Sequence, residues 1–301
     1  MVRTVVAGLD GSPESRAAAE WAAREAKLRG LPLRIVHVWE PVPAPMAQAP
    51  FLGAETRQQW TDQYPADTAA GLRLRHPGVE VTVEQADGRP ADVLLEAAKD
   101  ADLLVLGSRG LSGIGGFLVG SVGLAVVAHT TTPVVLVRAG EQAADEHQPD
   151  PVGIPSAATP YRPVVLGLDP AGPDDTLLEF AFEAAARRSA VLRIVYGWNL
   201  PPYYTYGLTV DPQFHDEVAR QQAAALAEAV RPWRRKYPDV EVVEESRAGS
   251  AAGFLVDAAD GAALLVVGRR ARRTPLGPFI GPVAHAVLHH STAPVAVVPH
   301  D

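Results

Sequence analysis

The chain has no cysteine among its 301 residues. This absence excludes disulfides, thiolate metal sites and cysteine nucleophiles, and it fits a reducing compartment such as the cytoplasm. Positive charge is also scarce. The chain has 27 lysines and arginines against 35 aspartates and glutamates, so its formal net charge is −8. Such a chain repels a nucleic acid at long range, so we expect no nucleic-acid partner, whereas a small anion can still bind in a local pocket.

Long hydrophobic runs are missing as well. No apolar stretch approaches the roughly 18 residues that a membrane-spanning helix needs. Residues 1–14 (MVRTVVAGLDGSPE) hold only a short apolar stretch interrupted by glycine and acid, which predicts a strand and not a signal peptide. We therefore expect a cytoplasmic protein with no membrane contact.

The sequence contains an internal repeat, which has to be recognised before any local assignment. Four segments recur in the same order: VVAGLD (5–10) as VVLGLD (164–169), LRIVHVW (33–39) as LRIVYGW (192–198), LVLG (104–107) as LVVG (265–268), and TPVVLV (132–137) as APVAVV (293–298). The first two pairs are separated by 159 residues and the last two by 161, as the starting numbers show. The chain is also long enough for two domains that each bury a core.

We place the first domain at residues 1–138 and the second at residues 162–301. Residues 139–161 between them are rich in proline, alanine and acidic residues without periodicity, which is the composition of an exposed linker.

Within each copy, short Val/Ile/Leu-rich runs alternate with Ala-rich amphipathic stretches, as in parallel strands joined by crossover helices. Ser12 is the expected N-cap of the first helix, with Pro13 in its first turn. The predicted strands of the first copy are 3–9, 33–39, 79–86, 102–107 and 133–137, and the predicted helices are 13–29, 56–76, 90–99 and 121–130. The fold class is therefore α/β, with a doubly wound open sheet in each copy.

Sheets of this kind bind ligands at the carboxyl ends of strands whose connections leave toward opposite faces. The expected site is therefore residues 8–12 (GLDGS) after the first strand and 107–121 (GSRGLSGIGGFLVGS) after the fourth. Glycines let the backbone approach a ligand and aim several amides at it. Gly120 and Ser121 start a helix whose N-terminus favours an anion, and Arg109 adds a charged donor. A surface loop without a ligand is the alternative for a lone glycine-rich loop.

The spacing of this loop narrows the choice. Gly107 and Gly110 bracket two residues, and nine residues separate Gly110 from Gly120, which Ser121 follows. This G-2x-G-9x-G-S pattern resembles the ATP-binding signature of the universal stress protein family. The resemblance extends to the opening Gly-x-Asp-Gly-Ser, the histidine-containing second strand and the closing TPVVLV, so it spans nearly all of both copies. The chain as a whole is similar to the tandem, two-domain form of the family.

The resemblance implies two Rossmann-like domains of the adenine nucleotide alpha hydrolase-like type, each a five-stranded parallel sheet with helices on both faces. It implies ATP, with or without Mg²⁺, between the first and fourth strand ends. The residues that would hold it are Gly8, Asp10, Val38, Gly107, Arg109, Gly110, Gly120, Ser121 and Val122. Asp10 would lie by the ribose or adenine and the Val38 backbone by the adenine edge. For Asp10 the residues alone leave a second interpretation, which is that it caps the following helix.

The second copy departs from the pattern. Its loop, residues 268–282 (GRRARRTPLGPFIGP), has Ala271 in place of the second glycine and Pro282 in place of the serine. Proline is tolerated in a first helical turn but brings neither N–H nor hydroxyl, so two donors to a phosphate are lost. The loop's four arginines either grip phosphates or an acidic surface, or form a solvated basic loop. The corresponding site residues would be Gly167, Asp169, Gly268, Arg269 and Gly281.

Other aromatic and histidine side chains have simpler interpretations. His285 and His289 stand four apart on the last helix beside His290, but no third ligand is evident and charge compensation at the helix C-terminus suffices, so we predict no metal. His37 is expected to be a satisfied core histidine. Three tyrosines that follow the second strand of the second copy would stack on a base or, more simply, pack in a loop or interface: Tyr203, Tyr204 and Tyr206.

The sequence favours nucleotide binding over nucleotide chemistry. It contains no Ser-Gly-Gly-x-Asp-Ser loop after the first strand and no Walker G-x-x-x-x-G-K-[ST], so an ATP-binding regulatory module of the stress response ranks above a slow ATPase or another adenine-nucleotide hydrolase. A scaffold that has lost its ligand is the third interpretation. We also expect the domains to pair through their last strands, residues 133–137 and 294–298, and two chains paired further would form a homodimer.

Overall fold

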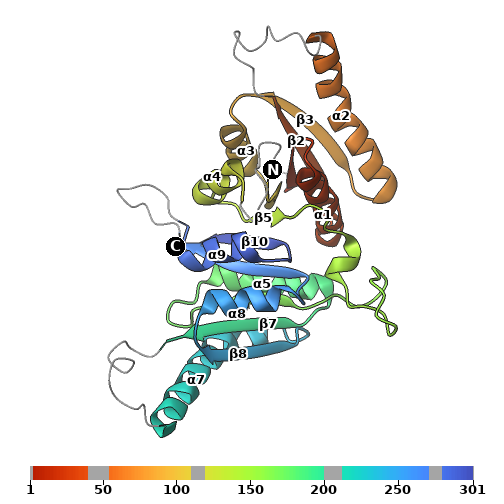
Figure 1. Ribbon diagram of the computed structural model, residues 1–301. Helices are drawn as coiled ribbons and strands as arrows, with labels where there is room; N and C mark the ends of the chain where they lie inside the picture. The colour runs from red at the N-terminus through yellow and green to blue at the C-terminus, as the bar shows by residue number, and fades with distance from the viewer. Residues whose placement is uncertain (1–2, 40–53, 110–118, 200–211, 271–279, 301) are drawn as a thin grey trace, which may run out of the picture. The chain divides into compact units, whose positions relative to one another are not determined.

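The computed structural model describes residues 3–39, 54–109, 119–199, 212–270 and 280–300. The chain divides into two compact units, Met1–Gln142 (unit 1) and Ala143–Asp301 (unit 2). Each unit is an α/β layer structure in which strands and helices alternate along the chain (Figure 1).

The described part of unit 1 has five strands and four helices. The strands are β1 (Val5–Leu9), β2 (Leu33–Trp39), β3 (Val81–Asp87), β4 (Leu103–Gly107) and β5 (Val134–Val137), and the helices are α1 (Pro13–Arg29), α2 (Ala54–Arg75), α3 (Pro90–Ala98) and α4 (Ser121–His129). All strand pairs in the order β3-β2-β1-β4-β5 are parallel. Each predicted element is present, and its ends lie within a few residues of those expected.

Unit 2 repeats this arrangement. Its described strands are β6 (Val164–Gly167), β7 (Leu192–Trp198), β8 (Val242–Ala248), β9 (Leu264–Arg270) and β10 (Val295–His300), and its helices are α5 (Asp175–Arg188), α7 (Pro212–Lys236), α8 (Ala251–Ala259) and α9 (Pro282–His290). The strand order within the unit is β8-β7-β6-β9-β10, again all parallel. The predicted tandem α/β fold is therefore confirmed.

The central strands form the core of each unit because helices cover both faces (Figure 1). In unit 1, α3 packs with α4, and α1 packs on β1, β4 and β5. Val5 and Leu103 are neighbours across the β1–β4 pair, and both are fully buried. Continuous apolar strands such as β4 have no polar face, as expected for a parallel sheet between two helix layers.

Helix α1 starts and ends as its sequence predicts. The Ser12 side chain caps it by accepting a hydrogen bond from the Ser15 amide at 3.0 Å, Pro13 occupies the first turn, and Gly30 ends the helix with a positive φ of 65°. The left-handed conformation at this C-cap is one that glycine adopts without steric cost.

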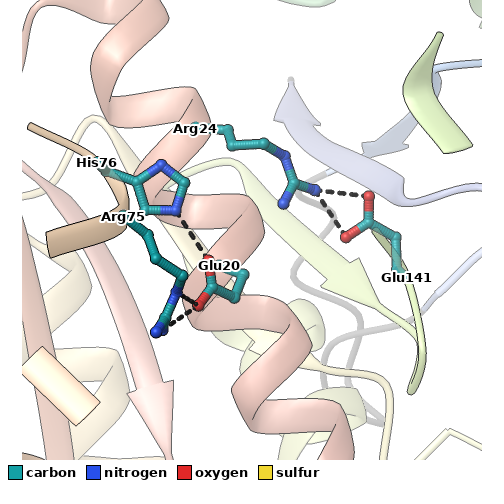
Figure 2. Close-up of polar contacts among 5 residues, drawn as sticks. All are labelled: Glu20, Arg24, Arg75, His76 and Glu141. Atoms are coloured by element: carbon teal, nitrogen blue, oxygen red, sulfur yellow. Dashed lines mark hydrogen bonds and ion pairs between the residues drawn. The ribbon is translucent and has the colours of Figure 1, made fainter. Parts of the chain in front are cut away.

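Polar contacts tie α1 to its surroundings (Figure 2). Glu20 accepts a hydrogen bond from Arg75 Nε at 2.7 Å and lies 2.8 Å from His76 Nε2, at the end of α2. Arg24 Nη2 donates to both carboxylate oxygens of Glu141, at 2.6 and 2.7 Å. The chain that follows β5 is thereby fixed to unit 1 as far as Glu141.

The segment between the repeats makes specific contacts within unit 2. Residues Ala143–Glu146 form a 3-10 helix, and the Glu146 carboxylate lies 3.6 Å from the Arg188 guanidinium, with both side chains almost fully buried. His147 and Tyr161 form an antiparallel bridge, and their ring centroids are 4.0 Å apart. A polar composition without periodicity gives no sign of these contacts, because they join residues far apart in the sequence.

Candidate functional site

In unit 1 the site is expected where β1 and β4 lie side by side at the centre of the sheet. The connection from β1 leads to α1 and the one that follows β4 leads to α4, so these two strand ends form the switch point of the fold. The residues that follow them are described for 10–12 and for 108–109 and 119–122; Gly110 lies outside the described residues.

Asp10 is exposed directly after β1. Its Oδ1 accepts hydrogen bonds from the Ser12 amide at 3.0 Å and the Ser12 hydroxyl at 2.6 Å. The Ser12 side chain, and not Asp10, caps α1, so the capping interpretation of Asp10 is wrong. Asp10 instead orients the residue that caps the helix, which keeps its carboxylate at the carboxyl end of the sheet.

Two of the predicted glycines lie in close packing, against a leucine side chain at Gly8 and against backbone at Gly107. A Cβ at Gly8 would lie 2.6 Å from Leu106 Cδ2, and a Cβ at Gly107 would lie 2.8 Å from the backbone of both Glu14 and Ser15. The absence of a side chain at Gly107 therefore lets the first turn of α1 approach the end of β4. This close approach needs glycine whether or not a ligand binds there.

A charged cluster that the sequence did not predict lies beside Gly107. Arg109 Nε is 3.4 Å from Glu14 Oε1, and the Glu14 side chain is mostly buried. Burial lowers the pKa of Arg138, which directly follows β5, and the positive charge of Arg109 lowers it further. Two guanidinium groups thus lie close enough to repel each other at the ends of β4 and β5, a local field that attracts an anion.

Helix α4 starts as the sequence predicts. Gly120 is its N-cap and donates its N–H to the Ser108 carbonyl at 2.8 Å, and Ser121 is the first helical residue. A glycine N-cap has no side chain to occupy the amides of Ser121, Val122 and Gly123, which have no intrahelical acceptor. The helix therefore presents an N-terminus whose dipole favours an anion.

The end of β2 completes the edge of the site. Val38 is half-buried and pairs with Ala86 of β3. His37, its neighbour, lies opposite Leu9 of β1, and its Nδ1 is 2.8 Å from the Leu9 carbonyl oxygen. The prediction that His37 has a hydrogen-bond partner is confirmed, although the side chain is half-buried and not within the core.

Unit 2 has a cavity of about 780 Å³ at the matching strand ends. All five residues predicted for the second site line it: Gly167, Asp169, Gly268, Arg269 and Gly281. Pro282 starts α9 in its first turn, as its position in the sequence predicts. The remainder of the arginine-rich loop, residues 271–279, and the three tyrosines at 203–206 lie outside the described residues.

The base of this cavity differs from unit 1. Helix α5 is capped by Asp174, which accepts hydrogen bonds from the Thr176 and Leu177 amides. His300, at the end of β10, lies 3.7 Å from Asp174 through Nδ1, and its Nε2 would be 2.5 Å from a Cβ at Gly268. A histidine side chain therefore lies where unit 1 has the backbone of Glu14, and no repeat or motif in the sequence indicated it.

The described residues contain no group of three or more metal-ligating side chains. The His285 and His289 rings on α9 have centroids 4.3 Å apart, and His289 and His290 lie in the last turn of the helix. Within the described ranges, none of the helices is both long enough and apolar enough to cross a membrane.

Residues 1–138 and 160–299 match the model of the universal stress protein family. A universal stress protein of Mycolicibacterium smegmatis is 31% identical over 304 residues, covering 98% of this chain and 96% of the relative. The crystal structure of a universal stress protein from Archaeoglobus fulgidus DSM 4304 covers 99% of this chain and 98% of its own, with a TM-score of 0.64 at 16% identity, which supports the fold.

A shorter universal stress protein solved in complex with cAMP is 28% identical; the match covers 46% of this chain and 98% of its own, with a TM-score of 0.35, too low to bear on the ligand here. Two family matches and a relative aligned over almost the whole length lead to one conclusion. The chain belongs to the universal stress protein family, in its tandem two-domain form.

Proposed function

We propose that the chain is a regulatory protein of the stress response whose first unit binds ATP, with or without Mg²⁺, at the ends of β1 and β4. The observation that carries the proposal is the start of α4, where Gly120 caps the helix and Ser121 begins it. These two residues close the G-2x-G-9x-G-S spacing. A helix N-terminus without a capping side chain suits a phosphate because its first amides have no intrahelical acceptor.

The neighbouring charges favour the same ligand. Arg109 and Arg138 lie at the ends of adjacent strands, and burial together with the Arg109 charge lowers the pKa of Arg138. A polyphosphate would relieve this repulsion and would compete with Glu14 for Arg109, which is 3.4 Å away. Charge-assisted hydrogen bonds from guanidinium groups to phosphate are among the stronger contacts of this kind.

The nucleoside end of the site would be formed by β1 and β2. The carboxylate of Asp10 is exposed and is held by Ser12, and it would lie by the ribose or adenine. The backbone of Val38 would face the adenine edge. We assign the phosphates and ribose to Gly107, Arg109, Gly110, Gly120, Ser121 and Val122, with Gly8 at the base of the site.

The test measures the nucleotide content of the protein and compares equivalent substitutions in the two units. The purified full-length protein is denatured, and the released adenine nucleotide is quantified per chain by chromatography. We expect about one ATP per chain in the wild type, none after Gly120→Glu, and no change after Gly281→Glu, because only the first helix start is proposed to bind phosphate. Among the described residues nothing lies within 4 Å of a Cβ at Gly281, so the control variant should fold.

The other outcomes each identify an alternative. About two nucleotides per chain would show that the second unit also binds, and loss in both variants would point to misfolding, which circular dichroism detects. Absence of nucleotide from the wild type, and no binding when ATP is titrated by calorimetry, would leave a ligand-free scaffold. Rapid release of phosphate from ATP and Mg²⁺ would instead make the protein an ATPase.

We further propose that the protein acts in the cytoplasm and that the last strands, β5 and β10, serve pairing of domains or of chains. An unpaired edge strand associates readily, which is the reason for expecting a homodimer. Light scattering that gives the mass of one chain at every concentration would contradict the homodimer, and cell fractionation tests the location.

A further inference from the structure

The cavity of unit 2 has the size and lining of a site for a small organic ligand. Its volume of about 780 Å³ lies within the range typical of such sites. Leu177, Val195, Leu255 and Val267 contribute an apolar wall, and a few charged side chains complete the lining. This combination suits a ligand with an apolar body and one polar end.

Arg270 supplies a positive charge at this cavity. By the offset of 161 it corresponds to Arg109, whose partner in unit 1 is Glu14. By the offset of 159, Pro173 replaces Glu14 in unit 2. Arg270 is exposed, lines the cavity and makes no hydrogen bond or ion pair with any other described residue. Its guanidinium therefore lacks the carboxylate that its counterpart has.

A loop, and not a helical turn, lies beside Arg270 because α5 starts late. Helix α1 begins at Pro13, whereas α5 begins at Asp175, which corresponds to Arg16. The first turn of α1 thus has no equivalent in unit 2, and Gly172 lines the cavity instead. A Cβ at Gly172 would lie 3.1 Å from Arg270 Nη2, so the guanidinium rests against this loop.

The remaining charged groups leave the cavity suited to a single anionic group. Arg269 lies buried in its wall, and burial lowers the pKa of this side chain, so a nearby oxyanion would stabilise its charged form. Asp169 is the opposing charge, and its Oδ1 accepts a hydrogen bond from the Ala171 amide at 3.0 Å. His300 is 3.7 Å from Asp174.

A triphosphate finds fewer donors here than in unit 1. Pro282 is the first residue of α9 and has no N–H, and Ala271 stands in place of the loop's second glycine. We propose that this cavity binds a small organic anion, with one carboxylate or phosphate group at Arg270 and an apolar or aromatic body against Leu177, Val195 and Leu255, in preference to ATP. This proposal is independent of the ATP site in unit 1.

The test uses the full-length protein and a fluorescent compound of the same chemistry. 8-Anilinonaphthalene-1-sulfonate has an anionic group on an aromatic body, and N-phenyl-1-naphthylamine is a neutral compound of similar shape. We expect saturable binding of the sulfonate that Arg270→Ala weakens about tenfold to a hundredfold, the range for a lost hydrogen bond to a charged group. Binding of the neutral compound should not change.

Two further variants test whether binding depends on charge at the cavity or only on the overall charge of the protein. Pro173→Glu puts a carboxylate at an exposed position next to Gly172, the residue on which the Arg270 guanidinium rests, so it should also weaken binding of the sulfonate. Arg235→Ala removes an exposed arginine of α7 that does not line the cavity, so binding should stay as in the wild type. Thermal unfolding followed by circular dichroism checks that all three variants are folded.

Competition then identifies the anionic group. We expect 4-phenylbutyrate or phenyl phosphate to displace the sulfonate, and the more effective of the two names the group that the site prefers. Wild-type binding of the sulfonate by Arg270→Ala, displacement by neither compound, or displacement by ATP at lower concentration than either would each overturn the proposal.

Discussion

The two units have the same strand order and differ at the place where their first helix begins. In unit 1 the backbone of Glu14 lies against Gly107 and its carboxylate pairs with Arg109. In unit 2 the His300 ring lies against Gly268, and the counterpart of Glu14 is Pro173. A duplicated sheet can therefore keep its core while one helix turn changes the charge and the space at the strand ends. Substitutions at corresponding places of the two units should therefore differ in their cost to stability.

The largest expected effect on the free energy of unfolding concerns the two ion pairs that hold the segment between the repeats, Arg24–Glu141 and Glu146–Arg188, here called the two anchors. Glu146 and Arg188 form an ion pair with 3% and 0% of their side chains exposed, whereas Arg24 and Glu141 are 15% and 5% exposed. Glu146→Ala takes away a carboxylate beside a buried guanidinium and should cost about 3–5 kcal/mol. Glu141→Ala, next to a partly hydrated arginine, should cost about 2 kcal/mol.

Urea unfolding of both variants, followed by circular dichroism, measures these costs. If Glu141→Ala costs as much as Glu146→Ala or more, the difference in burial does not determine how much each ion pair contributes to stability.

A smaller effect is expected at the glycines that end β4 and lie within β9. A methyl group at Gly107 would meet the backbone of Glu14 and Ser15, which cannot move independently of α1, whereas at Gly268 it would first meet the rotatable His300 side chain. Gly107→Ala should therefore cost about 1–3 kcal/mol as an overpacked site, and Gly268→Ala less. Melting temperatures of the two variants give the order directly, and the reverse order would rule out this account of the packing.

The smallest expected effect is the difference in stability cost between substitutions of Glu20 and of its counterpart Glu179. Burial alone would raise the pKa of Glu20, but hydrogen bonds from His76 and Arg75 outweigh it, so this pKa lies below its ordinary value of 4.5. Glu179 contacts only an exposed Lys236 at 2.6 Å among the contacts described for it. Glu20→Gln should cost about 1 kcal/mol at pH 7, and Glu179→Gln less than about half of that.

The cost of Glu20→Gln should depend on pH. Because the folded-state pKa of Glu20 is depressed, its contribution to the free energy of unfolding is present above the unfolded-state pKa and is lost as the pH falls through the folded-state pKa. Unfolding experiments between neutral and acidic pH should therefore show the wild type and Glu20→Gln converging in acid. A cost that stays constant with pH would mean that the substitution acts through packing.

The sequence predicts the strands and helices of this fold closely because each one has a local signal. Ser12 and Pro13 mark the start of α1, and Gly120 and Ser121 mark the start of α4. Such caps depend on neighbouring residues, and the repeat gives each prediction a second, independent copy. The same signals identified the ends of β1 and β4 as the candidate site.

The rest of the candidate site depends on contacts between distant residues. The pairing of Arg109 with Glu14 joins the segment after β4 to the first turn of α1, and the contact of His300 with Asp174 joins the last strand to a helix start. No spacing rule relates such residues, because their distance is decided by packing of the whole unit. Asp174 marks the late start of α5 as its N-cap, but the cavity beside this helix start is visible only in three dimensions.

The two anchors have a consequence for how such a chain can be divided. Glu141 is held by Arg24 in the first half, and Glu146 is held by Arg188 in the second. A break between Gln142 and Ala143 would separate the halves without removing either carboxylate from its arginine. Each half of the gene would then encode both partners of the ion pair that holds its chain near the break. A module that is copied, exchanged or expressed alone needs its end held in this way.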